Sequence, residues 1–531
     1  MATSAPWPRP DRSPAMSPSD RRSATPVAIV GAGPVGLSLA LGLARHGVRS
    51  VLVERKESTS DRSKAPAIHV RTREIFRQWG IEERFLEAGV LRQSLILHSP
   101  APGRRPLMSV DFSQLAVEAE RPGLLVLEQA HTEKLLLEAV LESGLCEIRF
   151  ATEVVGLVQG SGGATLTLHG FQGERSLDAE FVVGCDGAGS FVRVALGLPF
   201  EGVTYSVRPM LADIRIADER DALPWPRTHN GRSGLTTAIR LSPGLWRLIR
   251  IERGEPTQAE EVSAAEVNDR MTEVLGEGDF ESVWASRFRI HRRSSPRFRV
   301  GRVLLAGDAA HVHSPVGGLG MNGGIQDAHN LAWKLAYALR GGDLDRLLDS
   351  YEVERRAVIV ESVSRYTDLI TRSFLDSPAM MRQAAFTLFQ VLLRSSRIRR
   401  MNLRRTAMLD LDYPASPLLD SRERAAGVRL PNPLLQAPDG TAVRLYDLLP
   451  NAPVMLEMVE ASHAEIDLPV EKVIRLGQGG YHDPSGLLRR QLGSRTGWML
   501  VRPDTHIAWA RRRPDGMRKA VRHALGTQDR L

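Results

Sequence analysis

The chain has 531 residues, of which 42% are hydrophobic and 25% are charged, the balance of a globular protein with about two to four domains. Its net charge of +8 is diffuse, because 62 acidic residues are interspersed among 70 basic ones, so we expect no nucleic-acid-binding stripe. The chain has only two cysteines, Cys146 and Cys185, so we expect no disulfide framework. It shows neither a secretion signal nor a run of apolar residues long enough to span a membrane, so we expect a cytoplasmic protein.

The N-terminal part changes character near residue 25. Residues 1–24 are rich in Pro, Ser and Arg and predict a disordered tail. The next segment, TPVAIVGAGPVGLSLALGLARHGVRSVLVER, predicts a strand, a glycine turn, a helix and a second strand.

The glycine turn matches the dinucleotide-binding fingerprint GxGxxG, with Gly31, Gly33 and Gly36 at its glycine positions and Glu54 at the end of the second strand. In this context the helix N-terminus receives a pyrophosphate, and the acid accepts hydrogen bonds from the ribose hydroxyls. A second fingerprint, which a separate nicotinamide domain would need, is not visible. We therefore expect bound FAD, with NADH or NADPH as a transient reductant.

The middle of the chain predicts further strands. ERSLDAEFVVGCDG, residues 174–187, reads as a strand that meets an Asp-Gly turn. MLADIRI and LWRLIRIE, residues 210–216 and 245–252, are typical of an antiparallel sheet. Trp225, Trp246 and Arg247 lie in or near this sheet, so an aromatic ligand is a plausible occupant.

Residues 301–336 concentrate seven glycines around one aspartate and one helix start. Leu304, Leu305 and Ala306 finish a strand, and Gly307 lets the chain turn so that Asp308 can reach a polar group such as a ribityl hydroxyl. The next positions keep side chains away from a large, flat group; they are Pro315, Gly317, Gly318, Gly320, Gly323 and Gly324. A helix that begins near Met321 would aim its positive end at the N1 and O2 atoms of a reduced flavin. His311 and His313 could suggest a metal, but no carboxylate or cysteine stands at convincing ligand spacing, so we expect none.

The C-terminal third predicts a long helical region and then a separate unit. The arginine cluster RSSRIRRMNLRR, residues 394–405, interrupts the helical region and is interpreted as a solvated face or a subunit contact. Pro- and Asp-rich segments near 410–440 predict a linker.

Three motifs of the chain resemble, in order and spacing, the signatures of the class A FAD-dependent aromatic hydroxylases, the family of para-hydroxybenzoate, phenol and polyketide hydroxylases. They are GAGPVG with Glu54, VVGCDGAGS with Asp186, and AGDAAHVHSPVGGLGMNGGIQDAHNLAWKL. AAHxxxP is usual in this family where no metal is bound. The C-terminal unit resembles the thioredoxin-like domain of phenol and polyketide hydroxylases in VRLYDLL, VMLEMV and a terminal hairpin, GWMLVRPDTHIAWARR. It has no cysteine, so its expected role is structural or in dimerisation.

The resemblance also implies cofactor roles for single residues. Gln129 stands where the family has a glutamine near the ribityl chain, although His131 replaces a frequent arginine. Arg55 and Arg71 resemble cofactor-contacting arginines, with surface pairing as the alternative, and Arg193 matches an arginine whose role is structural. The expected FAD-binding set is Gly31, Gly33, Pro34, Val35, Gly36, Glu54, Arg55, Arg71, Gln129, Asp186, Asp308, Pro315, Gly318, Gly320, Met321 and Asn322.

The family's chemistry defines the implied function. NADH or NADPH reduces FAD, O2 adds to form a C4a-hydroperoxide, and its distal oxygen attacks an activated aromatic ring. The substrate is expected to be phenolic, in the manner of a phenylpropionate or a polyketide. The catalytic base stays unidentified, and His229, Tyr205, Arg215 and Arg240 are favoured as structural or surface residues.

The expected fold is α/β: a Rossmann-like FAD-binding domain, an interleaved antiparallel substrate domain and a thioredoxin-like domain. The expected FAD-binding domain comprises 25–95, 125–200 and 290–345, and the substrate domain comprises 96–124 and 201–289. A helical linker over 346–415 and the thioredoxin-like domain over 416–531 follow. A flavin-dependent oxidase or dehydrogenase, or a non-enzymatic flavin protein, stays open as an alternative, and a homodimer is an expectation.

Overall fold

The computed structural model describes most of the chain beyond its N-terminal tail. The described residues are 25–60, 65–98, 106, 108–231, 234–254, 262–278, 280–420, 425–459, 470–493, 496–513 and 516–526. The tail predicted over 1–24 lies outside them.

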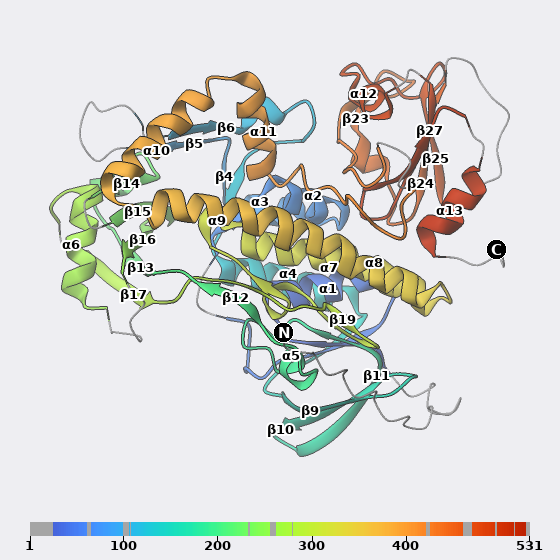
Figure 1. Cartoon of the computed structure of the whole chain (residues 1–531), viewed down its shortest axis with the longest axis horizontal. Coiled ribbons are helices and arrows are strands. Elements are labelled where there is room, and N and C mark those ends of the chain that lie inside the picture. Colours follow the sequence, from blue (N-terminus) through green and yellow to red (C-terminus); the bar gives the residue numbers. More distant parts are fainter. Residues whose placement is uncertain are drawn as a thin grey trace, which may run out of the picture.

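Five parallel strands form the centre of the largest sheet (Figure 1). In spatial order they are β20 (Val303–Leu305), β11 (Gly173–Gly184), β1 (Thr25–Val30), β2 (Ser50–Val53) and β8 (Cys146–Arg149). Three antiparallel strands extend the sheet: β19 (Arg299–Val300), β9 (Glu153–Gln159) and β10 (Ala164–Gly170). The predicted strand, turn, helix and strand are β1, α1 and β2, so that prediction is confirmed.

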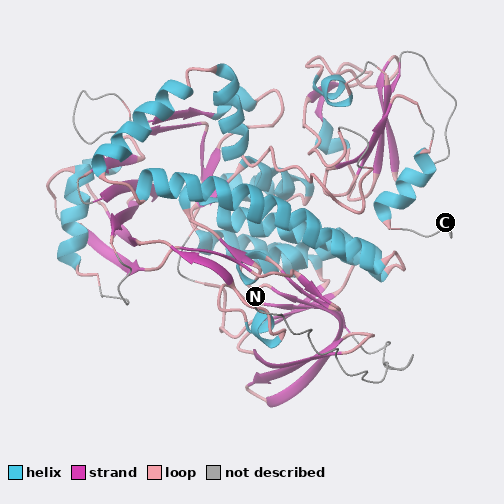
Figure 2. Cartoon of the chain, in the orientation of Figure 1, coloured by secondary structure: helices cyan, strands magenta, loops and turns pink. Residues whose placement is uncertain are grey.

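Helices pack against this sheet and run together through the middle of the molecule (Figure 2). The main ones are α1 (Pro34–Arg45), α4 (Gln129–Ser143), α7 (Leu319–Leu339) and α8 (Leu344–Arg356). Helix α7 begins two residues before the predicted Met321, and it is buried along most of its length. The predicted long helical region continues from α8 through η6 (Ala357–Val363), α9 (Ser364–Ile370) and η7 (Thr371–Leu375).

The predicted antiparallel sheet is confirmed. Its order is β14 (Arg227–Asn230), β15 (Gly234–Ser242), β16 (Leu245–Arg253), β13 (Val207–Arg215) and β17 (Glu281–Arg287). Helix α6 (Ala264–Leu275) covers its outer face (Figure 1). Smaller sheets and helices complete this part: β12 (Glu201–Thr204), β18 (His291–Ser294) and β21 (His311–Val312); β3 (Ala67–Ile68), β7 (Leu124–Val126) and β4 (Val90–Arg92); β5 (Ser94–Leu97) and β6 (Met108–Asp111); α2 (Val70–Gln78), α3 (Glu82–Ala88) and α5 (Phe191–Ala195).

The arginine cluster at 394–405 interrupts the helical region as predicted, but only over a short connection. It spans the connection from α10 (Ala379–Leu392) into α11 (Ser396–Thr406) and most of α11 itself. Arg404 and Arg400 pair with the buried Glu118, and Arg405 pairs with Asp410. The cluster therefore serves contacts within the chain.

The C-terminal unit contains a four-stranded sheet in the order β25 (Lys472–Gly477), β24 (Val454–Val459), β26 (Gly497–Val501) and β27 (Ile507–Arg511). Only β26 runs antiparallel to the rest, which is the strand arrangement of the thioredoxin fold. The predicted hairpin is β26 and β27, but α13 (Met517–Leu525) follows it. The hairpin β22 (Leu434–Gln436) and β23 (Ala442–Arg444), η8 (Leu445–Leu448) and α12 (Leu487–Leu492) complete the unit. Trp333 of α7 shares an apolar core with Trp498 and Trp509, so the two parts of the chain are packed together.

Candidate functional site

The first glycine turn is closely packed against the loop after β11. Gly31 has a φ of +105°, and a Cβ at this position would lie 2.6 Å from the carbonyl oxygen of Cys185 and 3.1 Å from the Cα of Asp186. A Cβ on Gly36 would lie 1.9 Å from the carbonyl oxygen of Gly31. These two glycines are required by the fold itself, whatever the turn binds.

Gly33 is different, because nothing in the described structure requires a glycine there. Its φ of −73° and ψ of −179° suit any residue, and a Cβ would meet no atom within 4 Å. It is the N-cap of α1, with Pro34 in the first turn and no side chain capping the free N–H groups. Space at an uncapped helix N-terminus is what a pyrophosphate needs.

The third motif lies against the first. A Cβ on Gly307, whose φ is +60°, would lie 2.7 Å from Cγ2 of Val35, and a Cβ on Gly324 would lie 2.5 Å from the same atom. Arg193 joins the second motif to the third, because its guanidinium donates to the carbonyl oxygens of Ala188 (2.7 Å) and Ala309 (2.9 Å). The three motifs therefore converge, and Arg193 has the structural role that the resemblance implied.

Asp186 presents an unused acceptor where the first two motifs meet. Its Oδ2 accepts a hydrogen bond from the backbone N–H of Val192 at 3.1 Å. Its Oδ1 is buried, and no described residue donates to it. Burial raises the pKa of the Asp186 carboxyl. A buried acceptor without a donor is costly, which indicates a hydroxyl or an amide of a ligand as its partner.

Glu54 lies beside the first turn, as the fingerprint predicts. Its carboxylate accepts from the backbone N–H groups of Ala32 (2.8 Å) and Lys56 (3.0 Å). A carboxylate offers about four lone-pair positions, so two hydroxyls can still donate to it. The neighbouring Arg55 is exposed.

Asp308 is exposed, although Gly307 and Ala309 on either side of it are buried. Asp327 of α7 fixes the position of this loop. Its carboxylate accepts from the N–H of Gly307 (3.0 Å), contacts Nε2 of His311 (2.6 Å) and accepts from Nε of Arg355 (2.6 Å). Burial alone would raise the pKa of the Asp327 carboxyl, but the charges of His311 and Arg355 lower it below its ordinary value.

Asp327 was not predicted from the sequence, although an acid inside the apolar run of a buried helix was an available signal. Its contact also gives His311 a role other than metal ligation. The described residues contain no group of three or more His, Cys, Asp or Glu that could hold a metal ion.

The glycine-rich segment before α7 is locked to the loop before α2. The amide of Asn322 accepts from the N–H of His69 (2.9 Å) and donates to the carbonyl oxygens of Ala67 and Gly318, both at 2.8 Å. His69 also contacts the carbonyl oxygen of Gly317 through Nε2 at 2.7 Å. Asn322 thus shapes the loop, a role that the sequence did not reveal.

The N-terminus of α7 resembles that of α1. Its N-cap is Gly318, in the left-handed conformation and without a capping side chain. A Cβ on Gly320 would meet no atom within 4 Å. Pro315 is exposed, and Met321 is half-buried. This is a second helix N-terminus with space in front of it.

Arg71 and Gln129 form contacts that the resemblance did not imply. The guanidinium of Arg71 donates to Glu74 (3.1 Å), and to Asp504 and Thr505 of the C-terminal unit, both at 2.9 Å. The Gln129 amide accepts from the N–H of Ala65 (3.2 Å) and donates to Glu133 (2.8 Å). The hydrogen bonds of Arg71 therefore serve an interface between domains, and its cofactor contact stays a prediction.

The candidate bases, of which Tyr205 lies just before β13 and the others lie in the antiparallel sheet, have partners or lie on its outer side. The Tyr205 hydroxyl donates to Asp368 at 2.7 Å, and Arg240 pairs with Asp221. Arg215 is exposed and lies 3.5 Å from Glu281. His229 pairs in register with Thr236, whose hydroxyl donates to Glu273 of α6, so it faces that helix.

The inner face of this sheet is turned toward the glycine-rich segment. Ile251, Leu235 and Ile249 form an apolar cluster with Val316, which directly follows Pro315. Leu235 and Ile249 are only half-buried, as is Thr237, which pairs with Ile249. On the opposite face, Trp246 and Leu248 are fully buried against α6.

The geometry suits FAD. Two uncapped helix N-termini, an orphaned buried carboxylate oxygen and an exposed aspartate are presented by three converging loops. The antiparallel sheet supplies an apolar wall beside them.

Comparisons with known proteins agree with this geometry. Residues 24–366 match the family model described as FAD binding domain, and residues 423–528 match the aromatic-ring hydroxylase C-terminal model. A 12-dehydrotetracycline 5-monooxygenase/anhydrotetracycline 6-monooxygenase of Streptomyces rimosus is 32% identical over 526 residues, covering 94% of this chain and 98% of the relative.

Two further relatives bear on the chemistry. The solved anhydrotetracycline hydroxylase of Streptomyces rimosus has a TM-score of 0.78 at 31% identity, and the match covers 94% of this chain and 99% of that one. A dialkyldecalin synthase of Streptomyces rugosporus is 34% identical over 336 residues, covering 62% of this chain and 69% of the relative.

Proposed function

The chain belongs to the family of FAD-dependent aromatic-ring hydroxylases, and from this membership we propose that its three converging loops hold FAD and that it hydroxylates a polycyclic aromatic compound beside them. FAD, once reduced by NADH or NADPH, supplies the redox chemistry that activates O2 and inserts one oxygen atom into the ring. Binding, orientation and exclusion of water are tasks of the chain's own residues.

The observation that carries the cofactor assignment is the free space at Gly33. A glycine that neither the backbone conformation nor a neighbouring atom requires, at the N-terminus of an uncapped helix, points to a ligand that needs the room. We assign the pyrophosphate to this position and the adenosine ribose to Glu54. The orphaned oxygen of Asp186 and the exposed carboxylate of Asp308 take hydroxyl groups of the connecting chain.

The flavin ring is assigned to the N-terminus of α7. The partial positive charge of this helix end stabilises negative charge on the reduced ring. The space at Gly320 lets the ring approach the backbone, and Asn322 keeps the preceding loop in place.

The substrate is assigned to the inner face of the antiparallel sheet. Leu235, Thr237 and Ile249 offer a half-exposed and mainly apolar surface that meets the glycine-rich segment at Val316. Asp213 and Arg247 add a buried ion pair on the same face, with both nitrogen–oxygen distances at 2.8 Å. Such a wall binds flat apolar rings and excludes water from the reacting centre.

The width of this wall favours several fused rings over one. The wall spans β13, β15 and β16, and three adjacent strands extend over about 10 Å. The tetracycline-type compounds named for the Streptomyces rimosus relatives consist of several fused rings. A polyketide-like phenol is therefore the proposed substrate class, ahead of a single-ring phenylpropionate.

A direct test combines cofactor, reductant and oxygen. We expect the purified protein to bind FAD, and polycyclic phenols to accelerate its oxidation of NADH or NADPH more than single-ring phenols do. One oxygen atom from labelled O2 should appear in the product. Stimulation by single-ring phenols alone would contradict the substrate class.

The same experiment separates the alternatives. An oxidase or dehydrogenase would leave the label out of the product, and a non-enzymatic flavin protein would show no stimulation. The relative named a dialkyldecalin synthase makes this control necessary, because its name describes no oxygenation.

A cytoplasmic location suits the proposed reductant and the free cysteines. The described helices include none long and apolar enough to cross a membrane. We place the protein in the cytoplasm, where NADH and NADPH are supplied and where unpaired cysteines such as Cys146 and Cys185 stay reduced.

The exposed Met380 and Met381 of α10 support self-association, which light scattering would detect.

A further inference from the structure

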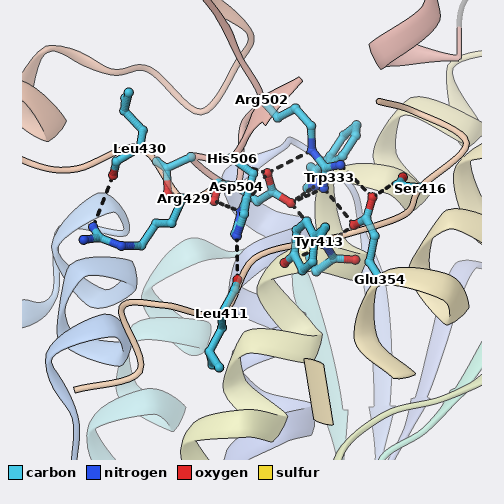
Figure 3. A network of polar contacts seen from close by, with 12 residues as sticks. Trp333, Glu354, Leu411, Tyr413, Ser416, Arg429, Leu430, Arg502, Asp504 and His506 are labelled. Carbon is cyan, nitrogen blue, oxygen red and sulfur yellow. Dashed lines mark hydrogen bonds and ion pairs between the residues drawn. The ribbon is translucent and has the colours of Figure 1, made fainter. Parts of the chain in front are cut away.

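The turn between β26 and β27 reaches from the C-terminal unit into the interior of the molecule. Its charged and polar residues are buried: Arg502, Asp504 and Thr505 are each 1% exposed, and His506 is 4% exposed. Figure 3 shows Arg502 and Asp504 directed at Glu354 and Trp333 of the long central helices, and His506 directed at the carbonyl oxygen of Leu411.

One side of this turn holds α7 and α8. Oδ2 of Asp504 accepts from Asn330 (3.1 Å) and from the indole N–H of Trp333 (3.3 Å), both on α7. Arg502 donates to both oxygens of Glu354 on α8, at 2.6 and 2.9 Å. Glu354 in turn accepts from Lys334 of α7 at 2.6 Å.

The other side of the turn holds α2. Nη2 of Arg71 donates to the carbonyl oxygen of Asp504 and to the hydroxyl of Thr505. Nearby, Arg429 of the C-terminal part pairs with Glu74, which is also on α2. The turn therefore cross-links α2 to α7 and α8, which are far from α2 in the sequence.

Helices α2 and α7 are both connected directly to the proposed flavin loops. The residue before α2 is His69, which binds Asn322 and Gly317. Helix α7 carries Asp327, which holds the Gly307 turn that presents Asp308. A displacement of either helix would move the loops at its end.

Thr505 indicates that this contact has a cost in local stability. Its φ is +60°, a conformation that a β-branched residue rarely adopts and that glycine adopts freely. A turn selected for stability alone would carry glycine or asparagine here. Threonine offers a hydroxyl that glycine lacks, and this hydroxyl accepts a hydrogen bond from Arg71.

We propose that the 502–506 turn positions the cofactor site, so that Asp504 and Thr505 act through α2 and α7 as positioning residues for the flavin. This inference rests on the proposed FAD site. It gives the C-terminal unit a part in cofactor binding rather than a separate role.

The test compares Thr505→Gly with Thr505→Ser. Glycine relieves the backbone strain and removes the hydroxyl, whereas serine keeps the hydroxyl. If the turn only joins strands, Thr505→Gly unfolds at the same or a higher temperature and binds FAD like the wild type. We expect instead that it keeps its melting temperature, that its Kd for FAD rises about five- to tenfold, and that its flavin reduction potential shifts. Thr505→Ser, which keeps the hydroxyl, should have the wild-type Kd for FAD and the wild-type flavin reduction potential.

A second pair checks the ionic contact. Asp504→Asn should raise the Kd for FAD at least as much as Thr505→Gly does. Glu457→Gln removes a buried charge from the same domain, where Glu457 pairs with Arg475 at 3.0 Å, and should leave the Kd unchanged. If Asp504→Asn does not fold, the Thr505 pair decides alone.

Hydrogen exchange in the flavin-free protein separates this inference from the proposed function. Thr505→Gly should accelerate exchange in residues 317–324, which form no hydrogen bond with the turn in the part of the chain that the structure describes. Faster exchange in a protein that never binds FAD would uphold the positioning and refute the cofactor assignment. Unchanged exchange together with an unchanged Kd would overturn the inference.

Discussion

Gly307 lies directly against Val35, so the turn that follows β20 packs on the first turn of α1. This contact sets the position of Asp308 relative to the N-terminus of α1. Replacing Gly307 by alanine would place a Cβ 2.7 Å from Cγ2 of Val35. We expect Gly307→Ala to raise the Kd for FAD at least about tenfold, as measured by quenching of flavin fluorescence.

Gly144 provides the control for backbone strain. Its φ of +64° is close to the +60° of Gly307, but a Cβ there would meet no atom within 4 Å. Gly144→Ala should therefore cost about 1 kcal/mol of stability and leave the Kd for FAD unchanged. Equal FAD affinities of the two variants would show that the contact with Val35 does not matter.

The orphaned oxygen of Asp186 gives a second prediction. Asp186→Asn keeps the shape of the side chain and removes its charge, so a ligand hydroxyl that donates to the carboxylate is left with a weaker hydrogen bond to a neutral amide oxygen. Hydrogen bonds to charged groups exceed neutral ones by about 1–1.5 kcal/mol, which corresponds to a rise in Kd for FAD of about five- to tenfold. Asp178, exposed on β11, the strand that precedes Asp186, is the matched control, and Asp178→Asn should bind FAD normally. An unaltered affinity of Asp186→Asn would rule out a ligand at this oxygen.

His69 makes the flavin loops sensitive to acid. Burial lowers its pKa from 6.5 to about 4, so between these values the unfolded chain binds the proton more readily than the folded one. The stability that His69 contributes is thus complete above pH 6.5 and is lost as the pH falls toward 4. His69→Gln retains a donor and does not titrate. Thermal unfolding from pH 7.5 to 4.5 should fall less steeply for His69→Gln, and parallel curves would contradict the assignment.

Asp327 is predicted to be a main determinant of stability. Asp327→Asn leaves the guanidinium of Arg355 buried without a counter-charge, which costs about 3–5 kcal/mol in the free energy of unfolding. Asp349→Asn breaks a pair of similar length, 2.6 Å to Arg299, but the side chain of Asp349 is 57% exposed. That variant should lose less than about 1 kcal/mol. Urea denaturation measures both, and equal losses would refute a special role for Asp327.

Local patterns were sufficient to group the residues of the candidate site that lie on single turns. Gly31, Gly33 and Glu54 were predicted as one group because a strand, a turn and a helix follow each other directly in the sequence, and the structure places Glu54 beside this turn. Asp308 was predicted because glycines surround it, and its contact with the cofactor stays a prediction. The antiparallel sheet was found from its alternation, but the sequence did not show that Leu235 and Ile249 would meet Val316.

The residues that the sequence did not reveal act across long separations. Asp327 contacts a turn that precedes its helix, and Arg71 contacts Thr505, more than 400 positions away. No periodicity or spacing records such a pair: the apolar run around Asp327 marks the acid as unusual but does not name its partner, and Arg71 and Thr505 are each typical of an exposed helix or a surface turn. Arg71 was accordingly predicted as a cofactor residue, with surface pairing as the alternative, and the role of the 502–506 turn was not predicted.

The most direct measurement concerns the space at Gly33. Gly33→Asp introduces a good N-cap residue into free space, so the flavin-free protein should be as stable as the wild type or more stable. Its carboxylate would occupy and repel the site assigned to the pyrophosphate. Gly160→Asp, at a position where a Cβ also meets no atom within 4 Å, controls for the added charge. We predict that Gly33→Asp folds and is purified without flavin, while Gly160→Asp retains it. A folded Gly33→Asp protein that binds FAD with the wild-type Kd would contradict the account.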